Sequence, residues 1–293
     1  PDSSIINIDD EWGRKLADDL KAEGQRVVTF SLTDSADSST TPSATTPSAE
    51  AASTPPRTEG ELNPAADLTA RDISVSLIKG TSFRLSTPIG ERTVHSPLVG
   101  KPHVYNMLAA TSAAFELGYS LDAIQKGLEK CVGAPGRFER VPHDGDFAVV
   151  VDYAHSDDAL LNVLRTAREL TNGKIITVFG CGGDRDKTKR GPMGEVAGRH
   201  SDFVIVTSDN PRTENPLKII EEIEAGLKNT KCEYQAVSDR RDAIFRALKK
   251  ADTNDVVLIA GKGHENYQII GNEKFDFDDR KVALEALEKL KEE

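Results

Sequence analysis

The chain has 293 residues, enough for two domains, and its 48 acidic against 37 basic residues give a formal net charge of −11. Its Lys and Arg residues are scattered, which argues against nucleic acid as a partner, and no run approaches the roughly 18 apolar residues that span a membrane. The three cysteines stand far apart without a C-x-x-C pair, so we expect reduced thiols in a cytoplasmic protein.

The first part of the chain, up to about residue 140, is predicted to contain short strands, helices and a low-complexity insertion. It opens directly into an apolar strand at Ile5-Ile6-Asn7-Ile8. We interpret this strand as part of a larger sheet, and the chain as a fragment of a longer protein. From about residue 34 to residue 67 the sequence is mostly Ser, Thr, Pro, Ala and acidic residues. Such a segment buries too little apolar surface to offset its ordering entropy, so we expect disorder, with a docking or modification segment as the alternative.

Around this insertion the pattern predicts further strands and helices. The strands are expected at Arg26–Ser31, Ile73–Ile78 and Ser82–Ser86. Val104–Leu117 places apolar residues on one helical face, and Leu121–Cys131 follows Ser120, a preferred helix N-cap.

After residue 140 the sequence alternates regularly between short apolar strands and helices. The strands are expected at Phe147–Val151, Lys174–Phe179, Phe203–Thr207, Glu233–Val237 and Val256–Ala260. The helices are expected at Asp157–Leu170, Met193–His200, Pro216–Lys228, Arg240–Lys250 and Arg280–Lys291. Gly271-Asn272 favours a hairpin between Tyr267–Ile270 and Lys274–Phe277. The alternation of strands apolar on both faces with helices predicts an α/β fold with a doubly wound, mostly parallel sheet.

Four loops at the ends of these strands carry glycines or charged residues. They are Asp152–His155, Gly180–Asp186, Ser208–Arg212 and Gly261–Glu265. Ligands of such sheets bind where the chain leaves the carboxyl ends of the strands, so four such loops on one edge indicate a binding site.

The loop Asp209-Asn210-Pro211-Arg212 predicts a stiff turn that projects charged side chains. Pro211 fixes the backbone, and the guanidinium of Arg212 can grip a carboxylate through two parallel hydrogen bonds. A solvated turn with a surface ion pair is the alternative for an isolated D-x-x-R.

Glycine also marks two of the other loops. The glycines of Gly261–Glu265 allow a ligand to approach closely, and Glu265 could receive an ammonium group; a glycine cluster that merely stops a helix is the alternative. A phosphate-binding G-x-x-x-x-G-K-[ST] loop is absent from the sequence. Gly180–Arg185 lacks the G-x-G-x-x-G spacing and suggests only an anion- or carboxylate-binding loop. We interpret the basic residues after it, Lys187, Lys189 and Arg190, as a solvated face.

Asp152 leaves its strand at a position where an aspartate often accepts a ribose hydroxyl. His155 is interpreted either as a catalytic residue or as a buried histidine with satisfied hydrogen bonds, and its sequence context alone favours the second. The histidines have no partners at metal-ligand spacing, so no metal site is predicted.

Taken together and in this order, these motifs resemble the Mur ligase family, and in particular its diaminopimelate-adding branch. The matching stretches are Ile6–Asp10, Val104–Ala110, Pro135–Val141, Val151–His155, Gly180–Arg190, Asp209–Pro216 and Gly261–Glu265. The resemblance implies that residues 1–140 are the last part of a central ATP-binding α/β domain. It implies that residues 141–293 are a Rossmann-like domain that binds the amino acid.

The resemblance implies an ATP-dependent amide ligase of peptidoglycan precursor synthesis. ATP would phosphorylate the terminal carboxylate of UDP-N-acetylmuramoyl-L-alanyl-D-glutamate, and the amine of meso-diaminopimelate would attack the acyl phosphate. The family's G-T-N-G-K-T loop and its carbamylated lysine with bound Mg²⁺ lie upstream of the matching stretches. We therefore assign no catalytic or metal-binding residue in this chain, and we expect it to be a monomer that is inactive alone.

Site residues follow from the resemblance, position by position. For ATP it implies Asn106 at the adenine, Arg137 at the terminal phosphate and Asp152 at the ribose, with Tyr153 and His155 near the nucleotide. For diaminopimelate it implies Arg185, Asp209, Asn210, Pro211, Arg212, Gly261 and Glu265. The chain departs from the family in having Ser156-Asp157 where Thr-Pro is frequent, and in its Ser/Thr/Pro segment.

Two alternatives remain at this point. The lysine-adding relatives share the fold and reaction but lack the arginine of the D-N-P-R loop, so Arg212 argues against them. A noncatalytic amino-acid-binding module is favoured by the missing phosphate loop, whereas the residues matched to the nucleotide site favour a ligase.

Overall fold

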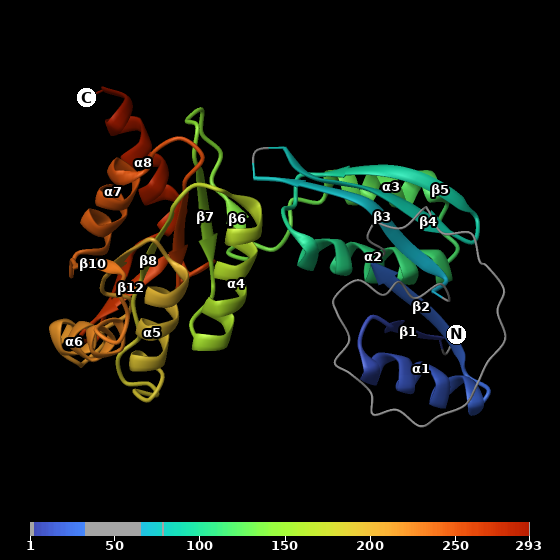
Figure 1. Ribbon diagram of the computed structural model, residues 1–293, viewed down its shortest axis with the longest axis horizontal. Coiled ribbons are helices and arrows are strands. Elements are labelled where there is room, and N and C mark those ends of the chain that lie inside the picture. Colours follow the sequence, from blue (N-terminus) through green and yellow to red (C-terminus); the bar gives the residue numbers. More distant parts are fainter. Residues whose placement is uncertain (1–2, 33–65, 78, 293) are drawn as a thin grey trace, which may run out of the picture. The chain divides into compact units, whose positions relative to one another are not determined.

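A computed structural model describes residues 3–32, 66–77 and 79–292 (Figure 1). The chain divides into two compact units, Pro1–Val132 and Gly133–Glu293. The insertion expected at residues 34–67 lies outside the described residues, apart from its last two positions. There, Asp67 accepts hydrogen bonds from the backbone N and the hydroxyl of Thr29, at 2.8 and 2.9 Å. The domain boundary expected at residue 140 stays a prediction.

The first unit is built on a mixed sheet in the order β1-β2-β3-β4-β5. Its strands are β1 (Ser3–Asn7), β2 (Arg26–Leu32), β3 (Leu68–Ser76), β4 (Gly80–Thr87) and β5 (Gly90–Ser96). Its helices are α1 (Glu11–Ala22), α2 (Lys101–Glu116) and α3 (Leu121–Lys130). Strands β1 to β3 pair in parallel and β3 to β5 antiparallel. The core lies between this sheet and helices α2 and α3, where Phe83 and Leu85 join Val104 and Leu108.

The sequence analysis missed α1 and β5 and placed the start of β3 too late. Helix α1 starts after Asp10, whose side chain accepts a hydrogen bond from Gly13 N at 2.8 Å, an N-cap signal in the sequence. Its face is hard to recognise because Ala17 is its buried residue. Strand β5 is mostly polar, with Val94 and Ser96 buried, and so lacks a clear alternation of apolar residues.

The second unit surrounds a six-stranded sheet in the order β10-β9-β8-β11-β7-β6. Its strands are β6 (Glu139–Arg140), β7 (Ala148–Asp152), β8 (Ile175–Phe179), β9 (Phe203–Val206), β10 (Glu233–Ala236) and β11 (Val256–Ala260). Its helices are α4 (Asp157–Leu170), α5 (Arg190–His200), α6 (Pro216–Leu227), α7 (Arg240–Lys250) and α8 (Asp279–Glu292). The short β6 is antiparallel to β7, and the other pairs are parallel. The predicted fold class is confirmed.

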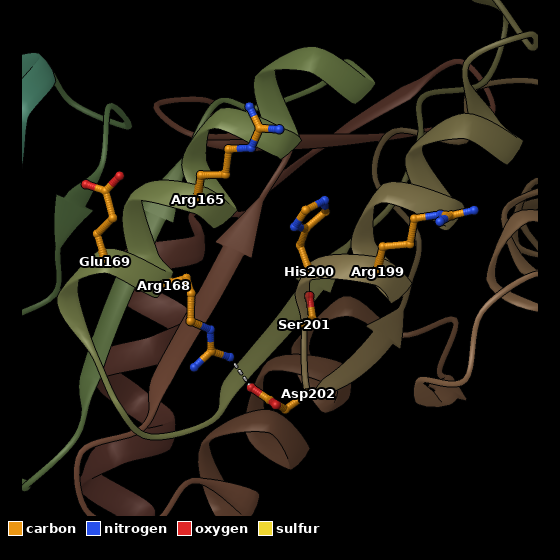
Figure 2. Close-up of a pocket in the computed structure, with 7 residues that line it drawn as sticks. All are labelled: Arg165, Arg168, Glu169, Arg199, His200, Ser201 and Asp202. Atoms are coloured by element: carbon orange, nitrogen blue, oxygen red, sulfur yellow. Dashed lines mark hydrogen bonds and ion pairs between the residues drawn. The ribbon is translucent and has the colours of Figure 1, made fainter. Parts of the chain in front are cut away.

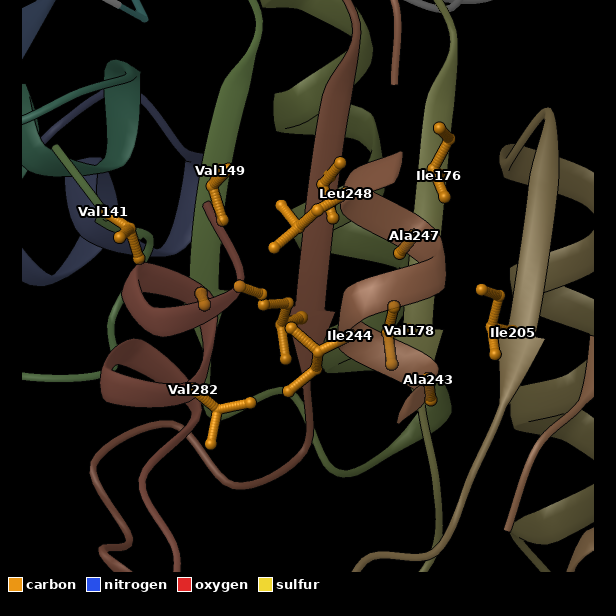
Figure 3. Packing of buried hydrophobic residues seen from close by; sticks show 14 of the residues in the cluster. Val141, Val149, Ile176, Val178, Ile205, Ala243, Ile244, Ala247, Leu248 and Val282 are labelled. Carbon is orange, nitrogen blue, oxygen red and sulfur yellow. The ribbon is translucent and has the colours of Figure 1, made fainter. Parts of the chain in front are cut away.

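Helices cover both faces of this second sheet. Helices α4, α5 and α6 pack side by side, and α7 packs against α8 and the central strands. Figure 3 shows the core under α7 and α8, where Ile244 and Val282 meet strand residues such as Val149 and Val178. None of the helices in the described residues has the length and apolar character that crossing a membrane requires.

The path of the chain places a reversal in the middle of the sheet. It proceeds from β7 to β8, β9 and β10, and then returns through α7 to insert β11 between β8 and β7 (Figure 1). Ligands of open α/β sheets bind at such a reversal, outside the carboxyl ends of the strands. The predicted hairpin is present as β12 (Tyr267–Ile270) and β13 (Glu273–Asp276), directly after the loop that leaves β11.

Candidate functional site

Loops that follow β7, β8, β9 and β11 lie at one edge of the second sheet, as their strand order requires. Backbone hydrogen bonds join them in pairs. Gly261 N donates to the carbonyl of Asp152 at 3.0 Å, and Gly183 N donates to that of Asn210 at 2.9 Å. The carboxylate of Asp209 lies against Gly261 and joins the two pairs, so the loops with the predicted site residues of the second unit form one linked set.

Asn106 does not belong to the unit that carries these loops. It is exposed on α2, in the first unit, whereas the other predicted site residues belong to the second. Its contact with adenine stays a prediction.

Asp209 is buried, and its carboxylate lies against Gly261. Gly261 has a φ of +111°, and a Cβ at this position would lie 2.8 Å from Oδ2 of Asp209. The backbone angle and the close approach both require glycine here. Burial raises the pKa of Asp209, while the nearby cations Lys262 and Arg240 act in the opposite direction.

Asn210, Lys262 and Glu265 form a closed triangle of hydrogen bonds. Asn210 Nδ2 donates to Glu265 Oε2 at 2.9 Å. Lys262 Nζ donates both to Asn210 Oδ1 and to the same Oε2 atom of Glu265, at 3.3 Å in each case. Ile269 N also donates to Asn210 Oδ1, at 2.9 Å, so its neighbours fix the orientation of the amide.

Arg212 is held by the hairpin β12–β13. Its φ is +51°, its N donates to the carbonyl of Ile269 at 3.1 Å, and its own carbonyl accepts from Gly271 N at 2.7 Å. Its side chain uses Nη1 to donate to the carbonyl of Gly183 at 2.8 Å. Within the described part of the chain, Nε and Nη2 of Arg212 donate no hydrogen bond, so they remain available to an anion.

Arg185 lies close to Arg212, with Gly182 between them. A Cβ on Gly182 would lie 3.0 Å from Nη1 of Arg212 and 3.8 Å from Cγ of Arg185. Arg185 is exposed, and its Nη1 donates to the carbonyl of Asp184 at 3.3 Å. Two guanidinium-bearing side chains therefore border the same glycine, which suits a carboxylate ligand.

Arg190 is buried. The interpretation of Lys187, Lys189 and Arg190 as a solvated face is therefore wrong for Arg190. Its guanidinium donates to Glu214 at 3.0 and 3.1 Å, to Glu222 at 2.8 Å and to the carbonyl of Gly182 at 3.3 Å. The bonds from Arg190 to Glu214, with those from Lys187 and the backbone N–H of Asp184, lower the pKa of Glu214 to about 2. Three basic residues within four positions of sequence do not reveal that one of them turns inward to acids more than twenty residues away.

Arg137, Tyr153 and His155, three of the residues predicted to lie near the nucleotide, are neighbours in the structure. The guanidinium carbon of Arg137 lies 5.3 Å from the centre of the Tyr153 ring, and the rings of Tyr153 and His155 are 4.7 Å apart. His155 is exposed, with Nδ1 3.0 Å from the carbonyl of Tyr153. The interpretation of His155 as a buried histidine is therefore wrong.

Asp152 stabilises the loop in which it lies. One carboxylate oxygen accepts from Phe138 N at 2.7 Å and the other from Ala154 N at 2.8 Å. These bonds fix its carboxylate at the end of β7, and its contact with ribose stays a prediction.

The sequence analysis gave no role to several side chains that support the site. Gln268 Nε2 donates to the carbonyl of Asp209 at 2.7 Å, which anchors the hairpin to the loop after β9. Arg240 is buried against Asp279, with contacts of 2.7 and 2.8 Å, and donates to the carbonyl of Ala260 at 3.0 Å. Lys262 lies within the motif Gly261–Glu265 but was given no role, and no local pattern predicts the partners of Arg240 and Gln268.

A separate pocket of about 430 Å³ lies where α4 and α5 end and β9 begins, close to the amino ends of the strands (Figure 2). Its lining residues are Arg165, Arg168, Glu169, Arg199, His200, Ser201 and Asp202. Arg168 is paired with Asp202, and burial together with Arg165 and Arg199 lowers the pKa of His200. None of the predicted site residues lines this pocket, so we do not assign the candidate site to it.

Residues 3–32, 66–77 and 79–292 contain no group of three or more His, Cys, Asp and Glu side chains arranged to hold a metal ion. The charged groups at the carboxyl edge instead suit a ligand that carries both a carboxylate and an ammonium group.

Comparisons with known proteins agree with these motifs. Residues 1–114 match the Mur ligase middle domain, and residues 136–263 match the Mur ligase glutamate ligase domain. The UDP-N-acetylmuramoyl-L-alanyl-D-glutamate–2,6-diaminopimelate ligase of Alkaliphilus oremlandii is 44% identical over 286 residues, which is 98% of this chain and 52% of that protein. The protein of the same name from Bacillus velezensis is 51% identical over 225 residues, 77% of this chain and 45% of its own length.

A solved structure of a ligase with this name superposes with a TM-score of 0.67 at 34% identity, covering 99% of this chain and 53% of that one. A pseudomurein peptide ligase from Methanothermus fervidus shares the fold, with a TM-score of 0.60 at 20% identity, over 98% of this chain and 56% of its own. The chain spans about half the length of the curated relatives that it matches. Matches over both of its units show that the chain belongs to the Mur ligase family.

Proposed function

We propose that this chain is part of an ATP-dependent ligase that adds meso-diaminopimelate to UDP-N-acetylmuramoyl-L-alanyl-D-glutamate in peptidoglycan precursor synthesis. Within it, residues 141–293 bind the amino acid, and residues 1–140 form the last part of a central ATP-binding domain. The relatives and the solved structure that carry this name support the proposal, each matched over about half of its length.

The arrangement of charges at the carboxyl edge is the main support for this substrate. Arg185 and Arg212 border Gly182, while Asp209 and Glu265 lie on the adjoining loops. The far end of meso-diaminopimelate carries a carboxylate for the arginines and an ammonium for the acids. Lysine offers the ammonium alone and leaves Arg212 unpaired, so we favour diaminopimelate as the substrate.

In this proposal the chain positions reactants for two chemical steps. ATP transfers its terminal phosphoryl group to the substrate carboxylate, which gives an acyl phosphate and ADP. The amine of diaminopimelate then attacks the acyl carbon, and phosphate leaves as the amide bond forms. Asn210, Pro211 and Gly261 shape the pocket that holds the amine in place.

We also propose the nucleotide contacts that the family resemblance implies. Arg137 would meet the terminal phosphate and Asp152 the ribose, Tyr153 and His155 would lie near the nucleotide, and Asn106 would contact the adenine. Bound Mg²⁺ would neutralise phosphate charge during transfer. The described residues offer no group of ligands for it, so none of its ligands is assigned to this chain.

Calorimetry of the chain with meso-diaminopimelate, lysine and ATP, each added separately, tests the proposal. We expect diaminopimelate to bind and lysine to bind at least tenfold more weakly. Equal affinity for both amino acids would favour the lysine-adding alternative, and amino-acid binding without any ATP binding would favour a noncatalytic module.

We also propose a cytoplasmic monomer that acts on small molecules. Cys131, Cys181 and Cys232 are free thiols, which fits a reducing compartment. Light scattering at several protein concentrations tests the monomer, and a mass that increases with concentration would contradict it.

A further inference from the structure

We propose that Lys262 is a positioning residue of the diaminopimelate site, whose buried ammonium fixes one oxygen of Glu265 and turns the other toward the ammonium of the ligand. This inference rests on the proposed function. It adds a role for a side chain that does not itself touch the ligand.

Burial separates Lys262 from the surface that a ligand can reach. Its side chain is 0% exposed, and that of Glu265 is 18% exposed. Lys262 Nζ donates to Glu265 Oε2 and Asn210 Oδ1, at 3.3 Å each, and its charge lies 5.5 Å from the centre of the Tyr267 ring. Lys262 therefore acts through Glu265 and Asn210.

The hydrogen bonds of Glu265 are unequally divided between its two oxygens. Oε2 accepts from both Asn210 Nδ2 and Lys262 Nζ. No residue in the described ranges donates to Oε1. With Oε2 held by two donors, the carboxylate has a fixed orientation before a ligand arrives, and Oε1 keeps its capacity to accept from an ammonium.

The charges of the surrounding groups give the same assignment. Arg240 is neutralised by Asp279 in a fully buried pair, which leaves Lys262 as the close counter-charge of Asp209 and Glu265. Two carboxylates and one ammonium carry a net charge of −1, which suits a single ligand ammonium. Without Lys262, the two carboxylates would repel each other in a poorly solvated site, and Asp209 would take up a proton.

Loss of Lys262 should change selectivity between ligands that differ in the ammonium group, whereas loss of Arg212 should change selectivity between ligands that differ in the carboxylate. The ammonium that Glu265 would receive is present in meso-diaminopimelate and absent from 2-aminopimelate, which otherwise has the same chain and carboxylates. Loss of Lys262 should therefore weaken diaminopimelate and leave 2-aminopimelate almost unchanged.

The test is calorimetry of the whole chain carrying Lys262→Met, which removes the charge and keeps an unbranched side chain. We expect diaminopimelate to bind about ten- to a hundredfold more weakly, because a charge-assisted hydrogen bond is lost. The affinity for 2-aminopimelate should change by less than about threefold. Lys274→Met is the matched control. Lys274 also lies over the Tyr267 ring, with Nζ 3.8 Å from its centre, but it donates no hydrogen bond to Glu265 or Asn210 among the described residues. If Lys262→Met does not fold, Lys262→Gln takes its place with the same expected losses.

A double variant separates positioning from general support of the fold. If Lys262 acts through Glu265, Lys262→Met combined with Glu265→Gln binds diaminopimelate no more weakly than Glu265→Gln alone. Additive losses, or equal losses for diaminopimelate and 2-aminopimelate, would overturn the proposal.

Hydrogen exchange of the Asn210 side-chain amide gives a readout that needs no ligand. We expect exchange at least tenfold faster in Lys262→Met and unchanged in Lys274→Met, and unchanged exchange in Lys262→Met overturns the positioning role. If the unaltered chain does not bind diaminopimelate, the proposed function of the site fails, and the exchange experiment still decides whether Lys262 positions Asn210.

Discussion

Nη1 of Arg212 donates a hydrogen bond to the carbonyl of Gly183, 2.8 Å away, and so links the loop after β9 to the loop after β8. This bond fixes one end of the guanidinium, and its outer edge is where we propose that a ligand carboxylate binds. The selectivity of the proposed site depends on this arrangement.

Replacing Arg212 tests that selectivity. Arg212→Ala should weaken diaminopimelate by about thirty-fold to several thousand-fold, because losing one partner of a charged pair that the bound ligand buries costs about 2 to 5 kcal/mol. Lysine binding should change little or improve. Arg212→Lys should restore only part of the loss, since an ammonium lacks the planar fork. The measurement is the affinity for both amino acids, and replacement of the exposed Arg246 by Ala is the control. Equal losses of affinity for diaminopimelate and lysine would show that Arg212 has a structural role.

Gly261→Ala should disturb both the fold and the site. Its φ of +111° disfavours a side chain, and the new Cβ would lie 2.8 Å from Asp209 Oδ2. Gly271→Ala is the matched control, because Gly271 also has a positive φ, +60°, but no atom within 4 Å of its added Cβ. Urea unfolding should give a loss on the order of 1 kcal/mol for the control and a larger one for Gly261→Ala. Equal losses would mean that the contact with Asp209 relaxes without cost.

The Arg190–Glu214 contact should contribute stability that depends on pH. The pKa of Glu214 falls from 4.5 to about 2 in the folded chain, so its contribution is complete above about 4.5 and is lost as the pH falls toward 2. Glu214→Gln should therefore lower the melting temperature at pH 7, and the difference from the unaltered chain should shrink as the pH falls below 4.5. Glu285→Gln, which removes an exposed ion pair, should show little difference at either pH. A constant difference for Glu214→Gln would refute the assignment.

The three thiols should differ in reactivity. Burial raises the pKa of Cys181 to about 12, Cys131 is exposed, and Cys232 is partly buried. Because the thiolate is the reactive form, a disulfide reagent at pH 8 should modify Cys131 first and Cys181 only after unfolding. Single-cysteine variants followed by absorbance check the order. Rapid modification of Cys181 in the folded chain would show that its loop opens.

The regular part of the fold could be predicted because each signal was local. The apolar strands of the second unit and caps such as Ser156 and Asn215 mark their elements within a few residues. Helix α1 was missed because its polar face dominates its sequence and it buries Ala17. The polar strand β5 was missed for a similar reason.

The site was only partly accessible from the sequence. The D-N-P-R and G-K-G-H-E motifs identified the loops, and the strand order brought them together. The bonds from Ile269 and Gln268 could not be predicted, because the hairpin contacts the loop after β9 across more than fifty residues of chain. The burial of Arg190 depends on Glu214 and Glu222 in the same non-local way.

The insertion of β11 between β7 and β8 also has a consequence for the order of assembly. During synthesis, β7 to β10 are complete before β11 exists, so the two strands that β11 separates cannot reach their final pairing until the chain has grown to about residue 260. The loop with Lys262 and Glu265 emerges directly afterwards. Completion of the sheet and of the proposed amino-acid site therefore both require the chain from β11 onward, and a nascent chain stopped before β11 would have neither.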